Sequence, residues 1–218
     1  MAVVAATRTT FPARLLVVVD RDYVGDDDRW LALIAEVARA AVGHPIAIQV
    51  RAKSTPSRSS TCSSRARDAV PYDVTLLLNG DAEVAERLGY TGVHWPETAV
   101  PSTGARDGLA LHSAAVHSIE AIRRAEAAGA DFVVFGAVYA PGSKPGEGVG
   151  VAALEAAVRA TQLPVVAIGG IQPEQIGECI RAGASGIAVV SGILGAQDVH
   201  AAIERYVHAI AVAEGTPA

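Results

Sequence analysis

The chain has 218 residues, half of them apolar, which suits one large domain or two small ones. Its 18 basic and 23 acidic side chains give a formal net charge of −5, which argues against a surface for nucleic acid or anionic membranes. The two cysteines, Cys62 and Cys179, lie far apart and outside any CxxC or Cys/His cluster, which excludes a disulfide framework and a structural zinc site.

Neither a signal peptide nor a membrane anchor is indicated. Residues 1–14 lack the basic start and the long apolar core of a signal peptide, and no apolar run approaches membrane-spanning length. We therefore expect a cytoplasmic protein with no nucleic-acid and no membrane partner. We expect a single domain over residues 1–218, with loose termini at 1–12 and 214–218. The oligomeric state stays open, and a homo-oligomer is compatible with these features.

Short apolar runs alternate with segments of helical periodicity along the chain. The first strand is predicted at 15–20, and the helix after it, 27–43, begins with acidic residues and ends at a glycine. Further strands are predicted at 45–51, 74–79, 92–95, 109–116, 131–138, 164–171 and 186–193. Further helices are predicted at 81–89, 117–129, 151–162, 174–183 and 198–215. The segment 54–70 is too rich in serine to indicate a helix, and 96–108 leaves room for a short helix or none.

This alternation predicts the fold class α/β. The strands show no polar alternation and each leads toward a helix, which is typical of a parallel sheet covered by helices. Eight such units in a chain of this length predict a single-domain (β/α)₈ TIM barrel. A doubly wound sheet is the alternative, but its usual GxGxxG in the first turn is absent.

In such a barrel, functional side chains lie at the carboxyl ends of the strands. Gln49, Arg51 and Lys53 are spaced by two at the end of the second strand, so all three can point to one side. Asn79 ends the third strand, and His117 follows the fifth. We expect the first four to bind substrate.

His117 is the candidate for proton transfer, because an unperturbed histidine has a pKa of about 6.5. The alternative is a structural histidine near a helix N-terminus. His94 is expected to be buried and hydrogen-bonded. His112 has the opposite parity to His117 and is expected to face the helices.

Two glycine-bearing turns follow the last two strands. Gly169 and Gly170 end one strand, and Ser191 and Gly192 end the other. Loops in these positions often bind phosphate in TIM barrels, because backbone N–H groups and helix N-termini converge there. We predict a phosphate-binding site of these four residues, to which Lys144 and Arg51 could add charge.

The motifs, taken in order, resemble those of the thiamine-phosphate synthases and their thiazole tautomerase relatives. The matching segments are QVRAK (49–53), LLLN (76–79), GVHW (92–95), AVHSIEAI (115–122), GADFVVFGAVYAPGSK (129–144), PVVAIGGIQPEQI (164–176) and AGASGIAVVSGI (182–193). The match is dense in the second half and loose over 54–108. The resemblance implies a (β/α)₈ barrel and adds Ser143 and Lys144 as substrate-binding residues.

The resemblance implies one of two reactions. The synthase joins a pyrimidine diphosphate to a thiazole phosphate and releases pyrophosphate, which calls for Mg²⁺ and carboxylates. The tautomerase relatives convert an alkylidene-dihydrothiazole carboxylate phosphate to its aromatic isomer by a 1,3-proton shift. They lack the metal carboxylates, and because no group leaves, no metal is required.

The chain departs from the synthase pattern at four positions. Gly80 and Ala99 stand where that pattern has its two aspartates. Ala115 replaces a serine, and Pro141 replaces a threonine of the TxTK motif.

Three functions remain on these grounds. The first, which we predict, is a thiazole tautomerase without cofactor or metal, in which Arg51 or Lys53 pairs with the substrate carboxylate and His117 moves the proton. The second is a synthase in which Asp81 or Glu97 replaces the missing metal carboxylates and holds Mg²⁺. The third is a silent barrel that binds a thiazole or thiamine phosphate and regulates a partner.

Overall fold

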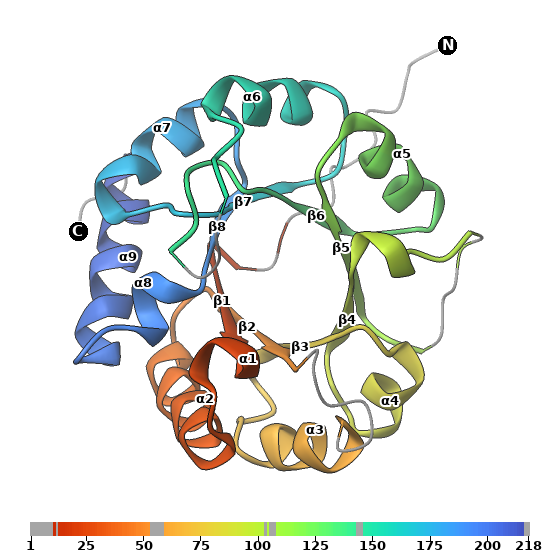
Figure 1. Cartoon of the computed structure of the whole chain (residues 1–218), viewed down its shortest axis with the longest axis vertical. Helices are drawn as coiled ribbons and strands as arrows, with labels where there is room; N and C mark the ends of the chain where they lie inside the picture. Colours follow the sequence, from red (N-terminus) through yellow and green to blue (C-terminus); the bar gives the residue numbers. More distant parts are fainter. Residues whose placement is uncertain are drawn as a thin grey trace.

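Eight parallel strands close into a barrel in sequential order (Figure 1). The structure is a computed structural model that describes residues 11, 13–52, 59–102, 104, 108–142 and 146–215. The strands are β1 (Leu15–Asp20), β2 (Ile46–Arg51), β3 (Thr75–Asn79), β4 (Gly92–Trp95), β5 (Leu111–Val116), β6 (Phe132–Gly136), β7 (Val165–Ile168) and β8 (Gly186–Val189). The predicted (β/α)₈ barrel is confirmed.

Helices form a ring around these strands (Figure 1). The α-helices are α1 (Arg21–Val24), α2 (Asp27–Ala41), α3 (Ser59–Asp68), α4 (Ala82–Arg87), α5 (Ile119–Ala127), α6 (Val151–Arg159), α7 (Ile176–Arg181), α8 (Ser191–Leu194) and α9 (Val199–Ala213). The 3₁₀ turns within the described residues are η2 (Glu97–Ala99) and η3 (Pro173–Gln175). Among the described residues, none of these helices is long and apolar enough to cross a membrane.

Two buried apolar layers position the site. The larger layer lies between strands and helices and includes Cys179, which is the small core residue that the helical pattern predicts. The smaller layer consists of inward-facing strand residues, such as Leu16 and Val134. Phe11 packs on Phe132 at the start of β6, with ring centroids 4.6 Å apart, and so closes the amino end. The interior is therefore filled at the amino end and has space at the carboxyl end.

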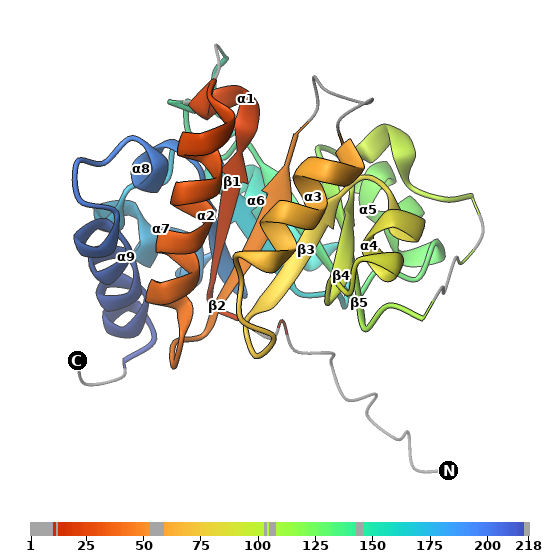
Figure 2. The ribbon, with the colours of Figure 1, turned by 90° about the horizontal axis from the view of Figure 1, so that it is seen from below.

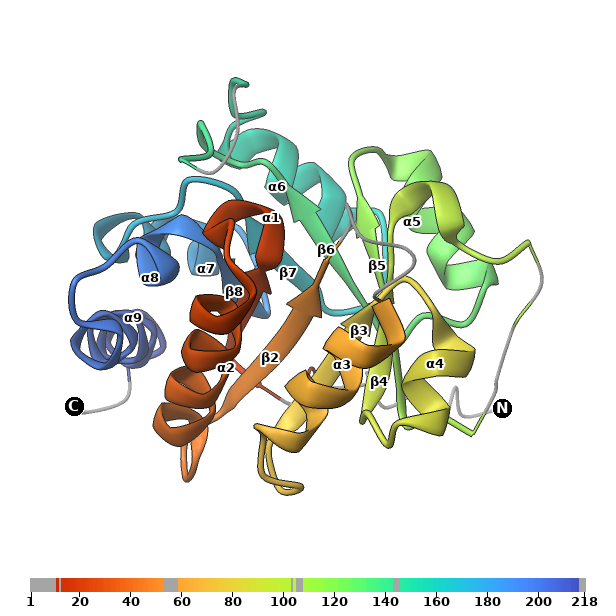
Figure 3. The same cartoon turned by 60° about the horizontal axis from the view of Figure 1, so that its bottom comes forward.

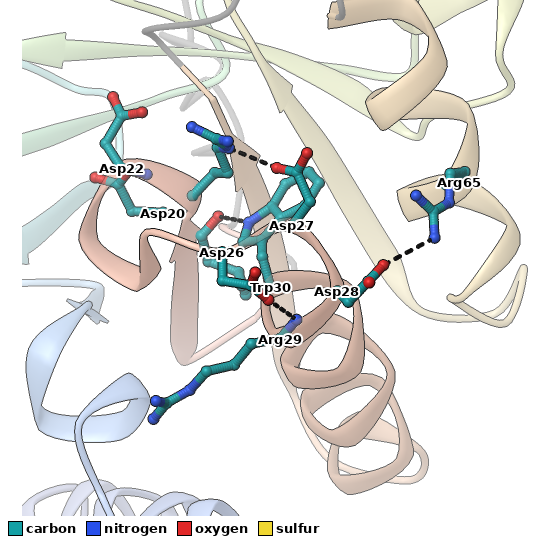
Figure 4. A network of polar contacts seen from close by, with 10 residues as sticks. Asp20, Asp22, Asp26, Asp27, Asp28, Arg29, Trp30 and Arg65 are labelled. Atoms are coloured by element: carbon teal, nitrogen blue, oxygen red, sulfur yellow. Dashed lines mark hydrogen bonds and ion pairs between the residues drawn. The ribbon is translucent and has the colours of Figure 1, made fainter.

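Short polar contacts hold α1 and α2 at the end of β1. The side chain of Asp26 caps α2 by accepting a hydrogen bond from the backbone N–H of Arg29 at 2.8 Å (Figure 4). The indole of Trp30 donates to the Val19 carbonyl at 3.0 Å and anchors α2 on β1. Figures 2 and 3 both place α1 and α8 at the same end of the barrel.

The structure differs from the predicted elements in several places, one of which is the short helix α1, which the sequence analysis does not predict. Residues 59–68 form α3, although their serine content argues against a helix, and Tyr90 donates to the Ser63 carbonyl at 2.8 Å to hold it. The last two strands are shorter than predicted, and Ser191–Leu194 forms α8 instead of extending β8. The tertiary contacts of α3 override its weak local preference.

The predicted loose termini lie largely outside the described residues. Phe11 and Glu214 belong to those segments and are described. Phe11 is buried, and Glu214 forms an ion pair with Arg14 at 3.1 Å.

Candidate active site

A cavity of about 330 Å³ opens at the carboxyl end of the barrel, and residues at the ends of all eight strands line it. This volume suits a small organic ligand. The predicted site residues that the structure describes all line it, namely Gln49, Arg51, Asn79, His117, Gly169, Gly170, Ser191 and Gly192. The other predicted site residues, Lys53, Ser143 and Lys144, lie outside the described residues.

Polar side chains from β1, β2 and β3 form one wall of the cavity. Gln49 Nε2 donates a hydrogen bond to Asn79 Oδ1 at 3.2 Å. Arg51 lies beside Asp20 in the register of β1 and β2, and its Nη1 donates to Asp20 Oδ2. Asp20 is buried and also caps α1, accepting from the Asp22 N–H at 3.1 Å. Arg51 is therefore a paired cation rather than a free one.

The histidines divide as their parity predicts. His94 is buried, lines the cavity, and its Nδ1 lies 2.9 Å from Ser113 Oγ. His112 is also buried, but its ring packs on Trp95 with centroids 5.2 Å apart, away from the cavity wall. The prediction that His94 is hydrogen-bonded and that His112 faces outward is confirmed.

His117 lies at the rim and has a carboxylate partner. Its Nδ1 is 2.5 Å from Glu97 Oε2, and Arg124 Nη2 donates to Glu97 Oε1 at 3.0 Å. Burial raises the pKa of Glu97, but the hydrogen bond and charge of His117 and the charge of Arg124 outweigh it. The pKa of this carboxyl is therefore below its ordinary value, and Glu97 is ionised at neutral pH.

Glycines 169 and 170 have φ values of +105° and +62°, which favour glycine. Close packing imposes a second requirement, since a Cβ at Gly169 would overlap Ala137 and one at Gly170 would overlap the Ala140 carbonyl. Neither the Gly170 N–H nor the Ser191 hydroxyl has a hydrogen-bond partner among the described residues. Both residues line the cavity, so these two donors are available to an anion.

Sequence reasoning assigns no role in the site to Asp20 or Arg124 and considers Glu97 only as a metal ligand. Asp20 is recognisable as the last residue of β1, but the pairing of Arg124 with Glu97 across α5 and η2 has no sequence signal. Asp81, the other proposed substitute carboxylate, caps α4 by accepting from the Val84 N–H at 3.0 Å and does not line the cavity.

The donor set around the cavity does not fit the Mg²⁺ that the synthase reaction implies. Its carboxylates among the described residues are Asp20 and Glu97, and each is paired with an arginine. Within the described part of the chain, no three His, Cys, Asp or Glu side chains come together as a metal site. Mg²⁺ prefers several oxygen ligands in near-octahedral geometry, which these paired carboxylates do not offer.

These features define a (β/α)₈-barrel protein with a polar cavity at the carboxyl ends of its strands. The chain belongs to the thiamine monophosphate synthase family, whose model matches residues 15–193. The resemblance of the quoted motifs to this family is thereby confirmed. The chain is an enzyme of thiamine biosynthesis, and the substrates of its family are phosphorylated small molecules.

Relatives and solved structures agree with this assignment. A thiamine-phosphate synthase of Methanoculleus marisnigri is 38% identical over 182 residues, covering 80% of this chain and 86% of the relative. A putative thiamine-phosphate synthase of Geobacter sulfurreducens is 35% identical over 191 residues, covering 84% and 88%. The thiamine phosphate pyrophosphorylase of Pyrococcus furiosus superposes with a TM-score of 0.73 at 28% identity, covering 93% of this chain and 97% of that one.

Proposed function

We propose that this protein isomerises a phosphorylated thiazole carboxylate to its aromatic tautomer by a proton shift at His117. The observation that carries the proposal is the pairing of His117 with ionised Glu97 at the cavity rim, at 2.5 Å. A histidine that is hydrogen-bonded to a carboxylate is suited to proton transfer. An isomerisation releases no pyrophosphate, so it needs no metal ion to neutralise the charge of a leaving group.

The other cavity walls supply binding. The Gly170 N–H and the Ser191 hydroxyl would hold the phosphate, with Gly169 and Gly192 leaving space for it. Arg51 would bind the carboxylate through the guanidinium N–H groups that Asp20 does not use. Gln49 and Asn79 would contact the ring of the substrate. No metal ion or cofactor takes part in this scheme.

A second candidate is thiamine-phosphate synthase itself, and a specific observation favours it. The relatives that match most of this chain at 33–38% identity carry that name, so the comparisons favour the synthase reaction over the isomerisation. The donor set argues in the other direction, because Asp20 and Glu97 are both engaged by arginines.

One pair of assays separates the two candidates. The purified chain is given the thiazole carboxylate phosphate tautomer, and the aromatic product is followed by NMR. In parallel it is given the pyrimidine diphosphate and the thiazole phosphate with Mg²⁺, and pyrophosphate release is measured. We expect the aromatic product in the first assay and no pyrophosphate release in the second.

The role of His117 is tested by His117→Ala. We expect isomerisation to fall by about 10²- to 10⁴-fold while the thiazole phosphate still binds. Isomerisation at the wild-type rate in this variant would contradict the proposal. Mg²⁺-dependent pyrophosphate release by the wild-type chain would establish the second candidate. Ligand-induced thermal stabilisation without turnover in either assay would identify a binding protein.

A further inference from the structure

We propose that Glu97 and Arg124 are positioning residues that make Nε2 of His117 the reacting nitrogen. The inference rests on the proposed function and deepens it, because it assigns the basic atom and the groups that select it. The contacts form a continuous chain from Arg124 on α5, through Glu97 in η2, to His117 after β5.

The identity of the basic nitrogen follows from the donors and acceptors along this chain. An ionised carboxylate can only accept a hydrogen bond, so the contact of Glu97 requires a proton on His117 Nδ1. A neutral imidazole carries a single ring proton, and the hydrogen bond at one nitrogen therefore determines the state of the other. With Nδ1 protonated, Nε2 holds the free lone pair.

Packing alone does not orient this ring. The side chain of His117 is 59% exposed, and the strand β5 ends one residue before it. Without a partner, the ring would sample several rotamers and both tautomers. The Glu97 carboxylate is less exposed, at 26%, and is the group that can hold the ring in one orientation.

Arg124 in turn restrains Glu97. It donates to Oε1, which leaves Oε2 for His117, so each carboxylate oxygen has a partner of its own. Its charge also keeps the carboxyl ionised, as described above. Arg123, the adjacent exposed residue on α5, forms no ion pair with the described residues and provides a matched control.

The direct test is the ring tautomer. Long-range ¹H–¹⁵N NMR spectra of the uniformly labelled full chain are recorded at mildly alkaline pH, and His117→Ala identifies the signals of this ring. We expect Nδ1 to carry the proton in the wild-type chain. We expect this tautomer to lose population in Glu97→Ala and Arg124→Met, and to be unchanged in Arg123→Met. A wild-type ring protonated at Nε2, or a spectrum of Glu97→Ala identical to wild type, would overturn the inference.

The kinetic test asks whether the restraint acts on the chemical step. We expect Glu97→Ala to lower the isomerisation kcat by roughly 10- to 100-fold and to leave KM little changed. This loss is smaller than the full contribution of a general base, because His117 itself is still present. Glu97→Gln should recover part of this loss, because its amide oxygen can still accept from Nδ1. A loss confined to KM, or an equal loss in Arg123→Met, would contradict a positioning role.

Two safeguards keep the result decisive. Thermal midpoints are measured for every variant, and if Glu97→Ala does not fold, Arg124→Met, a substitution at an exposed residue, carries both tests against Arg123→Met. If the wild-type chain shows no isomerisation, the proposed function fails, whereas the tautomer spectra still decide whether Glu97 selects Nε2.

Discussion

Asp20 and Arg51 occupy paired positions of the neighbouring strands β1 and β2, and the guanidinium of Arg51 donates to the carboxylate of Asp20. The carboxylate belongs to a residue that is only 5% exposed, and it also caps α1. The cation expected to receive the substrate carboxylate therefore has a negatively charged neighbour, which weakens its attraction for an anion but fixes its orientation.

Replacement of Asp20 by asparagine tests this balance. Asparagine keeps the helix cap but removes the charge from a buried pair, so we expect the free energy of unfolding to fall by about 2–3 kcal/mol. We also expect the affinity for a thiazole carboxylate phosphate to rise by about threefold to tenfold, since a like charge near the anion is lost. Urea unfolding and ligand titration measure the two effects. An unchanged or weaker affinity would show that Arg51 does not receive the carboxylate.

Position 170 requires glycine both because φ is positive and because neighbouring residues pack closely against it. Substitution of Gly170 should therefore be more destabilising than substitution of a glycine in an open turn. Gly43 has a φ of +79°, and a Cβ at this position would meet nothing within 4 Å, so Gly43→Ala should cost about 1–2 kcal/mol from the backbone alone. Gly170→Ala adds an overlap with the Ala140 carbonyl and should cost about 3 kcal/mol or more.

The same pair of variants tests the phosphate site. The increase in unfolding temperature on addition of inorganic phosphate should be smaller in Gly170→Ala than in the wild-type chain, and unchanged in Gly43→Ala. Equal stability losses in the two variants, or full retention of phosphate stabilisation in Gly170→Ala, would argue that residues 169–170 are a plain turn.

Tyr206 joins α9 to the two glycine-bearing turns. Its hydroxyl donates to the Ile171 carbonyl at 2.9 Å, and a Cβ at Gly192 would overlap that hydroxyl. Tyr206→Phe leaves a buried carbonyl unpaired, and we expect a loss of about 1–2 kcal/mol in the free energy of unfolding. Tyr72, which is 88% exposed, supplies the control variant Tyr72→Phe, for which no comparable loss is expected.

Alkaline pH provides a second measurement on Tyr206. Burial, and to a smaller extent the charge of Glu174, raises the pKa of Tyr206 from 10.0 to about 12, against the opposing charge of Arg205. Between these values the folded chain retains a proton that the unfolded chain has lost, so stability falls as pH rises. The fall should be shallower in Tyr206→Phe than in the wild-type chain, and identical pH profiles would contradict this assignment.

The two cysteines should differ sharply in reactivity. Cys179 is fully buried, and burial raises the pKa of its thiol to about 11, with Glu178 adding to the rise and a hydrogen bond with Tyr139 opposing it. Cys62 is partly exposed on α3. With a disulfide reagent at pH 8, Cys62→Ser should react only after unfolding, whereas Cys179→Ser should react in the native state. Rapid native labelling of Cys62→Ser would be inconsistent with the buried position.

The strands could be predicted because they are short apolar runs, a property of each segment by itself. The same is true of α2 and α5, whose apolar stripes and capping residues are local. The helix α3 could not be predicted, because its serine-rich sequence has little preference of its own and Tyr90 holds it from another segment. Likewise, the sequence predicts an extension of β8 in place of α8, since the four residues Ser191–Leu194 are too few to show helical periodicity.

The candidate site divides in the same way. Residue order and parity were enough to place Gln49, Arg51, Asn79 and His117 at one end of the barrel, because strand periodicity and the direction of parallel strands are local rules. The partners of these side chains came from the tertiary arrangement. Asp20 neutralises part of the charge of Arg51, and the Glu97 carboxylate contacts Nδ1 of His117. Such pairings depend on distances between segments that are 20 to 31 residues apart in sequence, which barrel closure sets and no local pattern encodes.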